Sequence, residues 1–473
     1  MLTRSLLLSL LVLPLAGCRV AAPGFRMKEV GVAVPGSWAV TREGKAGVDM
    51  DWVGRMGSPR LSSLVREAVA HNPDLKIAAA RVDQARSLIK TAGAPLQPKL
   101  DFEMLGNKTQ QNFIGLPIPG TNGVLKQTNE SYVSNFKGEW ELDIWGRYRA
   151  GKSAAIAAYQ GAAQDERAAQ AAIAAQVARA WFALIEASEQ VDLAGEAMKA
   201  YQDTQESLEQ RFRTGQAGDQ GGLGAQLRLA RSDIESARSV LEQRREAQGQ
   251  AARALEILLG RYPQGDRHKS DRLPALTSPP PAGLPSELLQ RRPDVLAAER
   301  RFAAQGMRQK EARRAVFPSL TLTGSLGTST SALSKILTSD FGVWSFGAKV
   351  FEPILTGGLV PAEVQKRKAE ESEALATLQK TVLKAFSEVE NALEAEQLLR
   401  RREESLVEAT RLAMEADSEA RADFRRGLGD ILTVLTTQQR AIQARSSLAA
   451  VRRLRLDNRV SLHLALGGDF RLR

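Results

Sequence analysis

Apolar residues in the second half of the chain recur at steps of three and four, the pattern of a helix that packs along another helix. The run covers residues 361–466 and is broken only at 424–430, where Gly427 and Gly429 allow the chain to reverse. The apolar positions before the break are Leu375, Leu378, Val382, Phe386, Val389 and Leu393. About 60 helical residues make a rod of roughly 90 Å, which is too long for the interior of an ordinary globular domain. The pattern predicts a hairpin of long helices that must pack against a similar element.

The first half of the chain carries a second copy of this pattern. Its apolar positions are Ile173, Val177, Ala180, Leu184, Ala187 and Val191. This run ends at Phe212-Arg-Thr-Gly215, which matches Phe424-Arg-Arg-Gly427. Three more pairs of motifs follow the same order at a nearly constant separation, namely Asn72-Pro-Asp with Arg292-Pro-Asp, Pro98-Lys-Leu with Pro318-Ser-Leu, and Trp140-Glu with Phe351-Glu. The chain is therefore a tandem duplication.

A strict alternation of apolar and polar residues predicts a strand at 132–144. One face carries the apolar side chains of Tyr132, Phe136, Trp140, Leu142 and Ile144, and the other face is mostly charged or polar. This pattern is typical of a membrane strand that faces lipid on one side and a wet lumen on the other. A half-solvated sheet in a soluble domain produces the same alternation, so the pattern alone does not decide between the two.

Each half of the chain offers two strands. The other three are at 99–107, at 320–326 and at 341–351, the last of which begins at Phe341 and ends at Phe351. A polar loop is expected at 108–130. Four strands cannot close a barrel, and an open sheet edge is not tolerated in hydrocarbon. Because membrane barrels have eight or more strands, several copies of the chain must pool their strands.

Composition and charge favour long, closely packed helices and exclude one class of partner. Aromatic residues make up only 5% of the 473 residues. The formal net charge is +11, but the arginines alternate with glutamates, as from Arg400 to Glu404. A nucleic-acid surface would need a patch of one sign. We therefore interpret these charges as solvated helix faces and expect no nucleic acid as a partner.

The N-terminus indicates where the protein resides. Arg4 precedes a short apolar run at 6–15 and the sequence Leu15-Ala-Gly-Cys18. Ten apolar residues are too few to span a bilayer, so this is a signal peptide. Leu-Ala-Gly-Cys resembles the bacterial lipobox, which implies lipid attachment at Cys18, the only cysteine; the alternative is a chance cysteine at a cleavage site. Arg19 in place of the aspartate associated with inner-membrane retention favours the outer membrane.

These features divide the chain into five segments. They are a signal peptide at 1–17, a lipid-anchored extended tail at 18–60, a first repeat at 61–272, a proline-rich connector at 273–285 and a second repeat at 286–473.

Residues 146–153 fit the pattern of a nucleotide-binding P-loop letter for letter. A P-loop strand is normally buried on both faces, whereas the strand before this motif is charged on alternate residues. The second repeat has lost the lysine and serine at the matching place. We therefore expect Arg147, Arg149 and Lys152 to lie at the membrane surface or the helix start. The glycine-rich segment 215–224 is better explained as a turn between two helices than as a phosphate site.

No other pattern of residues points to a reaction. His71, His268 and His463 lack ligand spacing, and the sequence has no Gly-x-Ser-x-Gly motif. We expect no enzyme activity, no metal and no cofactor.

The lipobox, the duplicated plan and the Phe-Arg-x-Gly turns together resemble the TolC-like outer-membrane factors, in particular their lipoprotein (NodT-like) efflux branch. The most specific pieces are Trp140-Glu-Leu-Asp-Ile-Trp-Gly-Arg147, Arg292-Pro-Asp-Val295 and Phe424-Arg-Arg-Gly427 leading to Gln438. The resemblance implies a mainly α protein with a membrane β part. Three chains would share a twelve-stranded β-barrel and a periplasmic α-barrel. The family's channels dock on a periplasmic adaptor and an inner-membrane pump of the RND or a related class, and export drugs or other small solutes.

The resemblance also implies roles for the two hairpin tips. In the second repeat, Phe424, Arg425, Gly427 and Asp430 would form the periplasmic gate, with Leu432 pointing into the constriction. In the first repeat, the tip that meets the adaptor would consist of Phe212, Arg213, Thr214 and Gly215.

Two positions depart from the family pattern. Family members often have tyrosine where Phe424 stands and an aspartate ring where Thr436 stands, so the usual latch and cation-binding ring are both in doubt. We hypothesise that Asp430 substitutes by pairing with Arg425 or Arg426 of a neighbouring protomer. Unchanged conductance of an Asp430→Ala channel would count against this hypothesis.

Another class of efflux protein provides the main alternative, a lipid-anchored periplasmic adaptor. An adaptor has one helical hairpin flanked by small β-domains. The duplicated hairpin with two strands in each half favours the channel.

Overall fold

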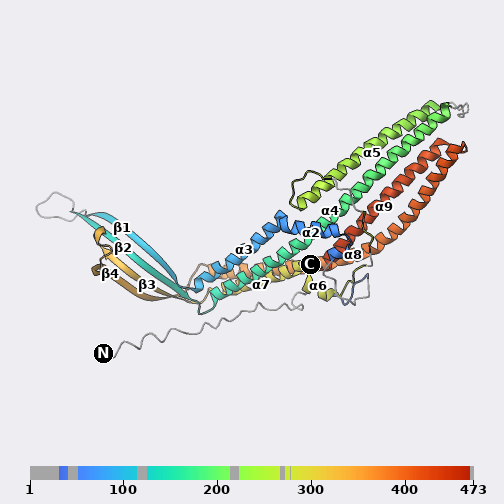
Figure 1. Cartoon of the computed structure of the whole chain (residues 1–473). Helices are drawn as coiled ribbons and strands as arrows, with labels where there is room; N and C mark the ends of the chain where they lie inside the picture. The colour runs from blue at the N-terminus through green and yellow to red at the C-terminus, as the bar shows by residue number, and fades with distance from the viewer. Residues whose placement is uncertain are drawn as a thin grey trace. The chain divides into compact units, whose positions relative to one another are not determined.

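The fold is that of a computed structural model that describes residues 31–40, 52–113, 125–213, 223–266, 272–276 and 279–468. Its longest elements are two helical hairpins (Figure 1). The first consists of α4 (Arg147–Arg213) and α5 (Leu223–Leu258), and the second of α8 (Leu359–Arg426) and α9 (Ile431–Ala465). The two long helical runs and the break at 424–430 are thus where the apolar periodicity predicts them.

Short helices precede each pair of strands. In the first repeat these are α2 (Pro59–His71), α3 (Pro73–Gly93) and the 3₁₀ turn η2 (Ala94–Leu96). In the second repeat they are α6 (Pro285–Arg291) and α7 (Pro293–Arg314). Four of these five begin with proline at N1, where its fixed φ suits a helix and its missing N–H costs nothing.

The matching motifs at Asn72 and Arg292 make the same contact in both repeats. Asn72 Nδ2 donates a hydrogen bond to the carbonyl of Leu258, the last residue of α5, at 2.8 Å. Arg292 Nη1 donates to the carbonyl of Ala465, the last residue of α9, at 3.2 Å. In each repeat, a buried side chain before the proline therefore ties a short helix to the end of a long hairpin.

Arg292 also forms ion pairs with two carboxylates. Its guanidinium lies 2.7 Å from Asp294 and 2.6 Å from Glu388. Burial of Asp294 opposes its ionisation, but the hydrogen bond and charge of Arg292 outweigh this and lower the pKa of that carboxyl below its ordinary value.

The four strands form one antiparallel sheet in the order β1-β2-β3-β4, so that β2 and β3 join the two repeats. They are β1 (Lys99–Phe113), β2 (Leu125–Leu142), β3 (Ser319–Thr330) and β4 (Gly342–Phe351). The register places one exposed apolar row across all four strands, made of Phe102, Phe136, Leu326 and Trp344. The adjacent row on the opposite face is Asp101, Lys137, Ser325 and Ser345. The sheet thus has one apolar and one polar face, as the alternation predicts.

The loop predicted at 108–130 is wrong at both ends. The first strand continues to Phe113 and the second begins at Leu125. Lys108 stands opposite Glu130, and their charged groups are 2.5 Å apart. The ladder hydrogen bonds of the hairpin and such cross-strand pairs override the low strand propensity of these polar residues.

Three predicted strand residues also need correction. Ile144 lies in a turn after β2, where its N–H donates to the carbonyl of Leu142 at 2.8 Å. Phe341 ends the 3₁₀ turn η4 (Ser339–Phe341), one residue before β4. Phe351 pairs with Ser319 and therefore falls on the polar face, where Lys349 Nζ lies 5.3 Å from its ring centroid. The register of the strand pair decides this, because neighbouring residues face opposite sides.

The extended tail predicted at 18–60 is wrong for its last residues. They form the helix α1 (Trp52–Arg55) and the start of α2, and Trp52 is fully buried. Trp38 is buried as well, and its Nε1 donates to the carbonyl of Gly283 at 3.0 Å. A large apolar ring gains more from burial than an extended surface path allows.

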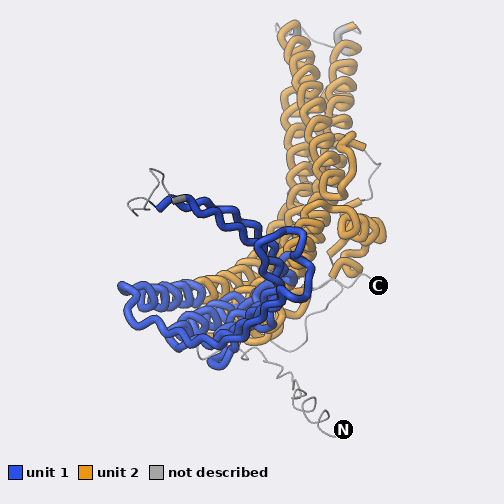
Figure 2. The backbone as a smooth tube through the Cα atoms, turned by 90° about the vertical axis from the view of Figure 1, so that its left-hand side faces the viewer, with its two compact units in different colours: residues 1–30, 84–160, 299–376 blue, residues 31–83, 161–298, 377–473 orange. Residues whose placement is uncertain are grey.

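The Cα positions fall into two compact units (Figure 2). Unit 1 contains residues 84–160 and 299–376, and unit 2 contains residues 31–83, 161–298 and 377–473. Each unit takes matching parts from both repeats, so the repeats are intertwined rather than being separate globules. The main apolar core lies in unit 2, where α1, α2, α4, α5 and α9 meet around Trp52, Leu61, Trp181 and Phe182.

The alanine-rich helix α4 is apolar and long enough to cross a membrane by composition alone. However, 56% of its most apolar window is buried inside the chain. Core residues such as Trp181 and Phe182 belong to this helix. We therefore interpret α4 as a packed core helix.

A buried ion pair joins α8 to α9. Arg459 Nη2 lies 2.6 Å from Glu396 Oε1, and both residues are less than one-tenth exposed. Asn458 Nδ2 donates to the carbonyl of Ala392 at 3.0 Å beside this pair. The pair extends through Arg455, whose guanidinium lies 2.5 Å from Glu403. Buried charges persist only when they are paired in this way.

We expect Glu396→Met to destabilise the helical hairpin by about 3–5 kcal/mol, because it leaves the Arg459 charge buried and uncompensated. The double variant Glu396→Met/Arg459→Met should recover most of this loss, because neither charge remains. Thermal unfolding of detergent-purified protein, followed by circular dichroism, measures both effects. A single variant as stable as the native chain would contradict this account.

Candidate functional site

The tip of the second hairpin is a tight turn that glycine makes possible. Gly427 has a φ of +82°, a conformation that other residues rarely adopt. Its N–H donates to the carbonyl of Phe424 at 3.0 Å, and the N–H of Leu428 donates to the carbonyl of Asp423 at 2.9 Å. These bonds satisfy carbonyls that the end of α8 leaves open. Arg425 and Arg426 lie in this last turn, where positive charge suits the helix dipole.

Asp430 caps the start of α9. Its Oδ1 accepts a hydrogen bond from the N–H of Thr433 at 2.9 Å, and its Oδ2 accepts one from the Thr433 hydroxyl at 2.7 Å. These bonds from the hydroxyl and the N–H lower the pKa of Asp430 below its ordinary value. Arg426 pairs with Asp423 of the same helix at 2.6 Å. Both Asp430 oxygens are thus engaged within the chain, and a pair across protomers would compete with the cap.

Phe424 does not present its ring to solvent. It is 4% exposed and packs with Leu208 of α4 and with Ile431 and Val434 of α9. This apolar cluster joins the tips of the two hairpins. Sequence reasoning placed Phe424 at the tip but did not anticipate its contact with the first repeat, which no local pattern encodes.

Leu432 and Thr436 lie on one side of α9 and line a groove of about 510 Å³ between α4, α5 and α9. Leu432 is 59% exposed. The Thr436 hydroxyl donates to the carbonyl of Leu432 at 2.7 Å, so it is used within the helix.

The tip of the first hairpin is described only in part. Phe212 and Arg213 are the last residues of α4, and the Arg213 side chain is exposed. Thr214 and Gly215 lie outside the described residues, as does Cys18.

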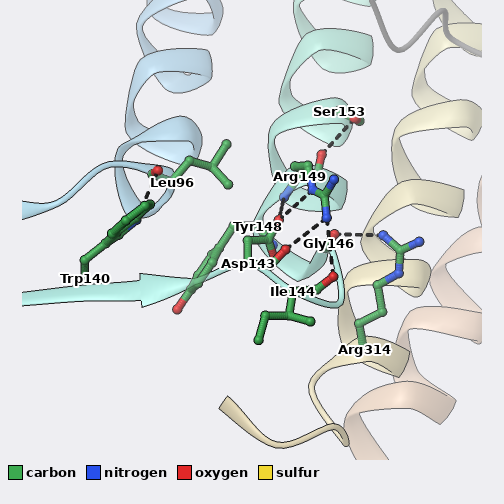
Figure 3. Close-up of polar contacts among 9 residues, drawn as sticks. All are labelled: Leu96, Trp140, Asp143, Ile144, Gly146, Tyr148, Arg149, Ser153 and Arg314. Atoms are coloured by element: carbon green, nitrogen blue, oxygen red, sulfur yellow. Dashed lines mark hydrogen bonds and ion pairs between the residues drawn. The ribbon is translucent and has the colours of Figure 1, made fainter. Parts of the chain in front are cut away.

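The strand–helix junction at 140–149 brings the most specific sequence motif together (Figure 3). Asp143 caps α4, because its carboxylate accepts hydrogen bonds from the N–H groups of Tyr148 and Arg149, both at 3.0 Å. The Arg149 guanidinium lies 3.1 Å from the same carboxylate. Arg314 of α7 donates to the carbonyl of Gly146 at 2.7 Å. Gly146 has a φ of +74°, which permits the sharp turn from β2 into α4.

This geometry shows whether the P-loop-like motif at 146–153 could bind a phosphate group. A P-loop binds phosphate through backbone N–H groups at a helix start. Here the Asp143 carboxylate occupies two of those N–H groups, and the Ser153 hydroxyl donates to the carbonyl of Arg149 at 2.8 Å. The junction is therefore a structural joint between strand and helix. Arg149 is used to hold that joint.

Two aromatic residues complete the junction. Trp140 Nε1 donates to the carbonyl of Leu96 at 3.3 Å, which ties β2 to the turn before β1. The Tyr148 hydroxyl donates to Glu141 at 2.7 Å. Burial and this hydrogen bond raise the pKa of Tyr148 to about 12, so the phenol stays neutral over the physiological range.

Within the part of the chain that the structure describes, no group of three or more His, Cys, Asp and Glu side chains is placed to hold a metal ion. His71 is exposed, and its Nδ1 lies 3.1 Å from the carbonyl of Glu67. His463 is buried and stacks on Trp52 at a centroid distance of 5.9 Å.

We expect Asp430→Ala to lower the stability of the first turn of α9 by about 1 kcal/mol, because the N–H of Thr433 loses the carboxylate that caps it. Asp430→Asn should retain most of the cap, since asparagine caps about as well as aspartate. Hydrogen exchange of the amides at 431–435, followed by mass spectrometry, measures the difference. Equal protection in Asp430→Ala and the native chain would show that the cap is unimportant.

The pKa of Asp430 predicts how this cap responds to pH. Because the folded pKa is lowered, its stabilisation is present above the unfolded value of about 3.9 and is lost only as pH falls through the lower folded value. We therefore expect the amide protection at 431–435, corrected for intrinsic exchange, to be constant from neutral pH down to about pH 4. A loss of protection already at pH 6 would contradict this assignment.

The sequence was compared with known proteins. A sequence profile described as outer membrane efflux protein matches residues 64–261 and 284–468. The pyoverdine export outer membrane protein OpmQ of Pseudomonas putida is 30% identical over 99% of this chain and 98% of its own length. The cation efflux system protein CusC of Escherichia coli K12 is 27% identical over 96% of this chain and 97% of its own.

The fold leads to the same group. The solved structure of the outer-membrane channel OprN superposes with a TM-score of 0.83 at 25% identity, covering 95% of this chain and 99% of that one. Its likeness extends over the strands as well as the hairpins, because so little of either chain is left out. The profile match and the whole-length relatives together show that this chain belongs to the outer membrane efflux protein family, a family of channel components and not of enzymes.

Proposed function

We propose that the chain is the outer-membrane channel of a tripartite efflux system, formed by three copies that share one β-barrel. The observation that carries the proposal is the four-stranded sheet, which exposes a continuous apolar row on one face and ends at two open edges. An apolar face of this kind suits lipid, and a polar opposite face suits a water-filled lumen.

The open edges require partners. Strands β1 and β4 are the outer strands of the sheet, so each leaves a row of backbone N–H and C=O groups on one side. In hydrocarbon each unpaired group costs several kcal/mol. Pairing β1 of one copy with β4 of the next removes both edges, and three copies supply twelve strands.

The relatives support the proposed partners and the general kind of cargo. Channels of this family work with a periplasmic adaptor and an inner-membrane pump. The relatives are named for export of pyoverdine and of cations, so the shared fold serves chemically different solutes. We propose drugs or other small toxic solutes as the cargo of this chain. The second-repeat tip around Phe424 would form the gate, and the first-repeat tip around Arg213 would meet the adaptor.

The alternative function, a lipid-anchored adaptor, is not supported. The profile and the relatives of nearly equal length are outer-membrane proteins. Two long hairpins and one shared sheet within a single chain also differ from the single hairpin of an adaptor.

Heat-modifiable migration on gels tests the assembly. We expect outer-membrane extracts to contain a species of about three chain masses when unheated, which collapses to the 51.4 kDa monomer or its processed form on boiling. Deleting the gene should raise the accumulation of a fluorescent dye in the cells, and restoring it should reverse the effect. A monomer that stays in the soluble periplasmic fraction would refute the channel.

The proposed lipid anchor is tested separately. We expect metabolic labelling with a palmitate analogue to mark the native protein and not Cys18→Ser. Labelling of both proteins to the same extent would exclude Cys18 as the attachment site. Leu15→Ala serves as a control that keeps the cysteine but changes the motif before it.

A further inference from the structure

The inference concerns the seam between α4 and α9, where the first hairpin contacts the second. Near the tips the seam is apolar, with Leu208 of α4 packed in one cluster with Ile431 and Val434 of α9. Farther from the tips it is polar and well paired, as at Gln190. Between these two regions lies Gln438, which is 1% exposed. Buried polar side chains normally have hydrogen-bond partners, so each exception needs an explanation.

The amide of Gln438 is poorly satisfied. No described residue accepts a hydrogen bond from its Nε2. Its Oε1 lies 3.5 Å from the Thr204 hydroxyl, but that hydroxyl also donates to the carbonyl of Ala200 at 2.8 Å. A hydroxyl has one hydrogen, and the shorter contact holds it better. Both polar atoms of the Gln438 amide are therefore buried away from water without a strong hydrogen bond in its place.

Gln190 shows what a satisfied glutamine looks like in the same seam. It is 5% exposed. Its Nε2 donates to Glu186 at 2.8 Å and to the carbonyl of Ser446 at 3.0 Å, and its Oε1 accepts from the Ser446 hydroxyl at 2.8 Å. Both residues are buried glutamines, but the amide nitrogen of Gln190 has two acceptors and that of Gln438 has none among the described residues.

Two hollows flank the seam beside Gln438. A cavity of about 410 Å³ lies between α4, α8 and α9 and is lined by Gln438. The groove of about 510 Å³ lies toward α5, and Leu193, Ala197 and Ile442 line both hollows. Small side chains face the first cavity at Ala197, Ala200 and Ala441. Short alanine side chains make fewer dispersion contacts between the two helices than longer apolar side chains would.

Charged side chains line the cavity beside Gln438. Its lining includes two ion pairs, Arg421 with Asp417 at 2.9 Å and Arg445 with Glu196 at 2.6 Å. When α4 and α9 separate, the amide of Gln438 can form hydrogen bonds with water. An apolar residue at this position would instead become exposed to water.

We propose that Gln438 is the point at which the two hairpins separate when the channel mouth opens, because its buried amide disfavours the joined seam. This inference rests on the proposed function and assigns a positioning residue to its gate. Gln438 acts by setting the balance between the joined and parted seam and does not itself contact cargo.

The test compares Gln438→Leu with Gln190→Leu in the full-length protein. Gln438→Leu removes an unsatisfied amide, so we expect the unfolding temperature to rise by roughly 2–4 °C. Gln190→Leu leaves the partners of a satisfied amide unpaired, so the same measurement should fall. In single-channel recordings from planar bilayers, Gln438→Leu should lower the open probability by a factor of about 5–30, and Gln190→Leu should raise it.

Two results would overturn the proposal. One is a fall in unfolding temperature for Gln438→Leu, which would mean that the amide is satisfied in the folded protein. The other is an unchanged open probability in a Gln438→Leu channel that conducts. A native protein that forms no channel at all would instead refute the proposed function. The unfolding temperatures of Gln438→Leu and Gln190→Leu would still test whether the amide of Gln438 destabilises the joined seam.

Discussion

The rest of the structure depends on the need to pair every backbone N–H and C=O group of a strand that lies in lipid. A sheet of four strands leaves two edges, and water is not available there to satisfy them. Neither β1 nor β4 can be relieved from within the chain, because the remaining described elements are helices, turns and irregular segments. One chain therefore supplies only part of a barrel, and several chains must assemble so that the backbone N–H and C=O groups at the sheet edges are paired.

The long helices meet a related constraint. Apolar side chains of α4, α5 and α9 are buried together with those of α1 and α2, and the tips of the two hairpins bury Leu208, Phe424 and Val434 against each other. The joints between elements are made by polar groups with fixed partners. Asp143 joins β2 to α4, Arg292 ties α6 and α7 to the end of α9, and the Glu396–Arg459 pair holds α8 to α9. The region around Gln438 differs from these joints, because its buried amide nitrogen has no hydrogen-bond partner among the described residues.

Much of the fold follows from local patterns. Steps of three and four predict the hairpins, alternation predicts the apolar face of the sheet, and Gly427 predicts the turn at the tip. Such patterns succeed because helix and strand geometry repeats every few residues. Such patterns predicted the wrong structure where the pairing of one strand with another determines the conformation or the face of a residue. The polar residues around Lys108 are strand because Glu130 stands opposite, and Phe351 faces the polar side because of its register with Ser319.

By itself, the sequence determined the duplication, the element types and the need for several copies, because each depends on residue order or on the number of strands. Only the tertiary structure decided what the tip residues contact. It placed Phe424 against Leu208, engaged Asp430 in a cap, and buried Gln438 without a partner for its amide nitrogen. These contacts join residues about two hundred positions apart or depend on a helix start, and their energies come from burial and hydrogen-bond geometry, which residue order does not display.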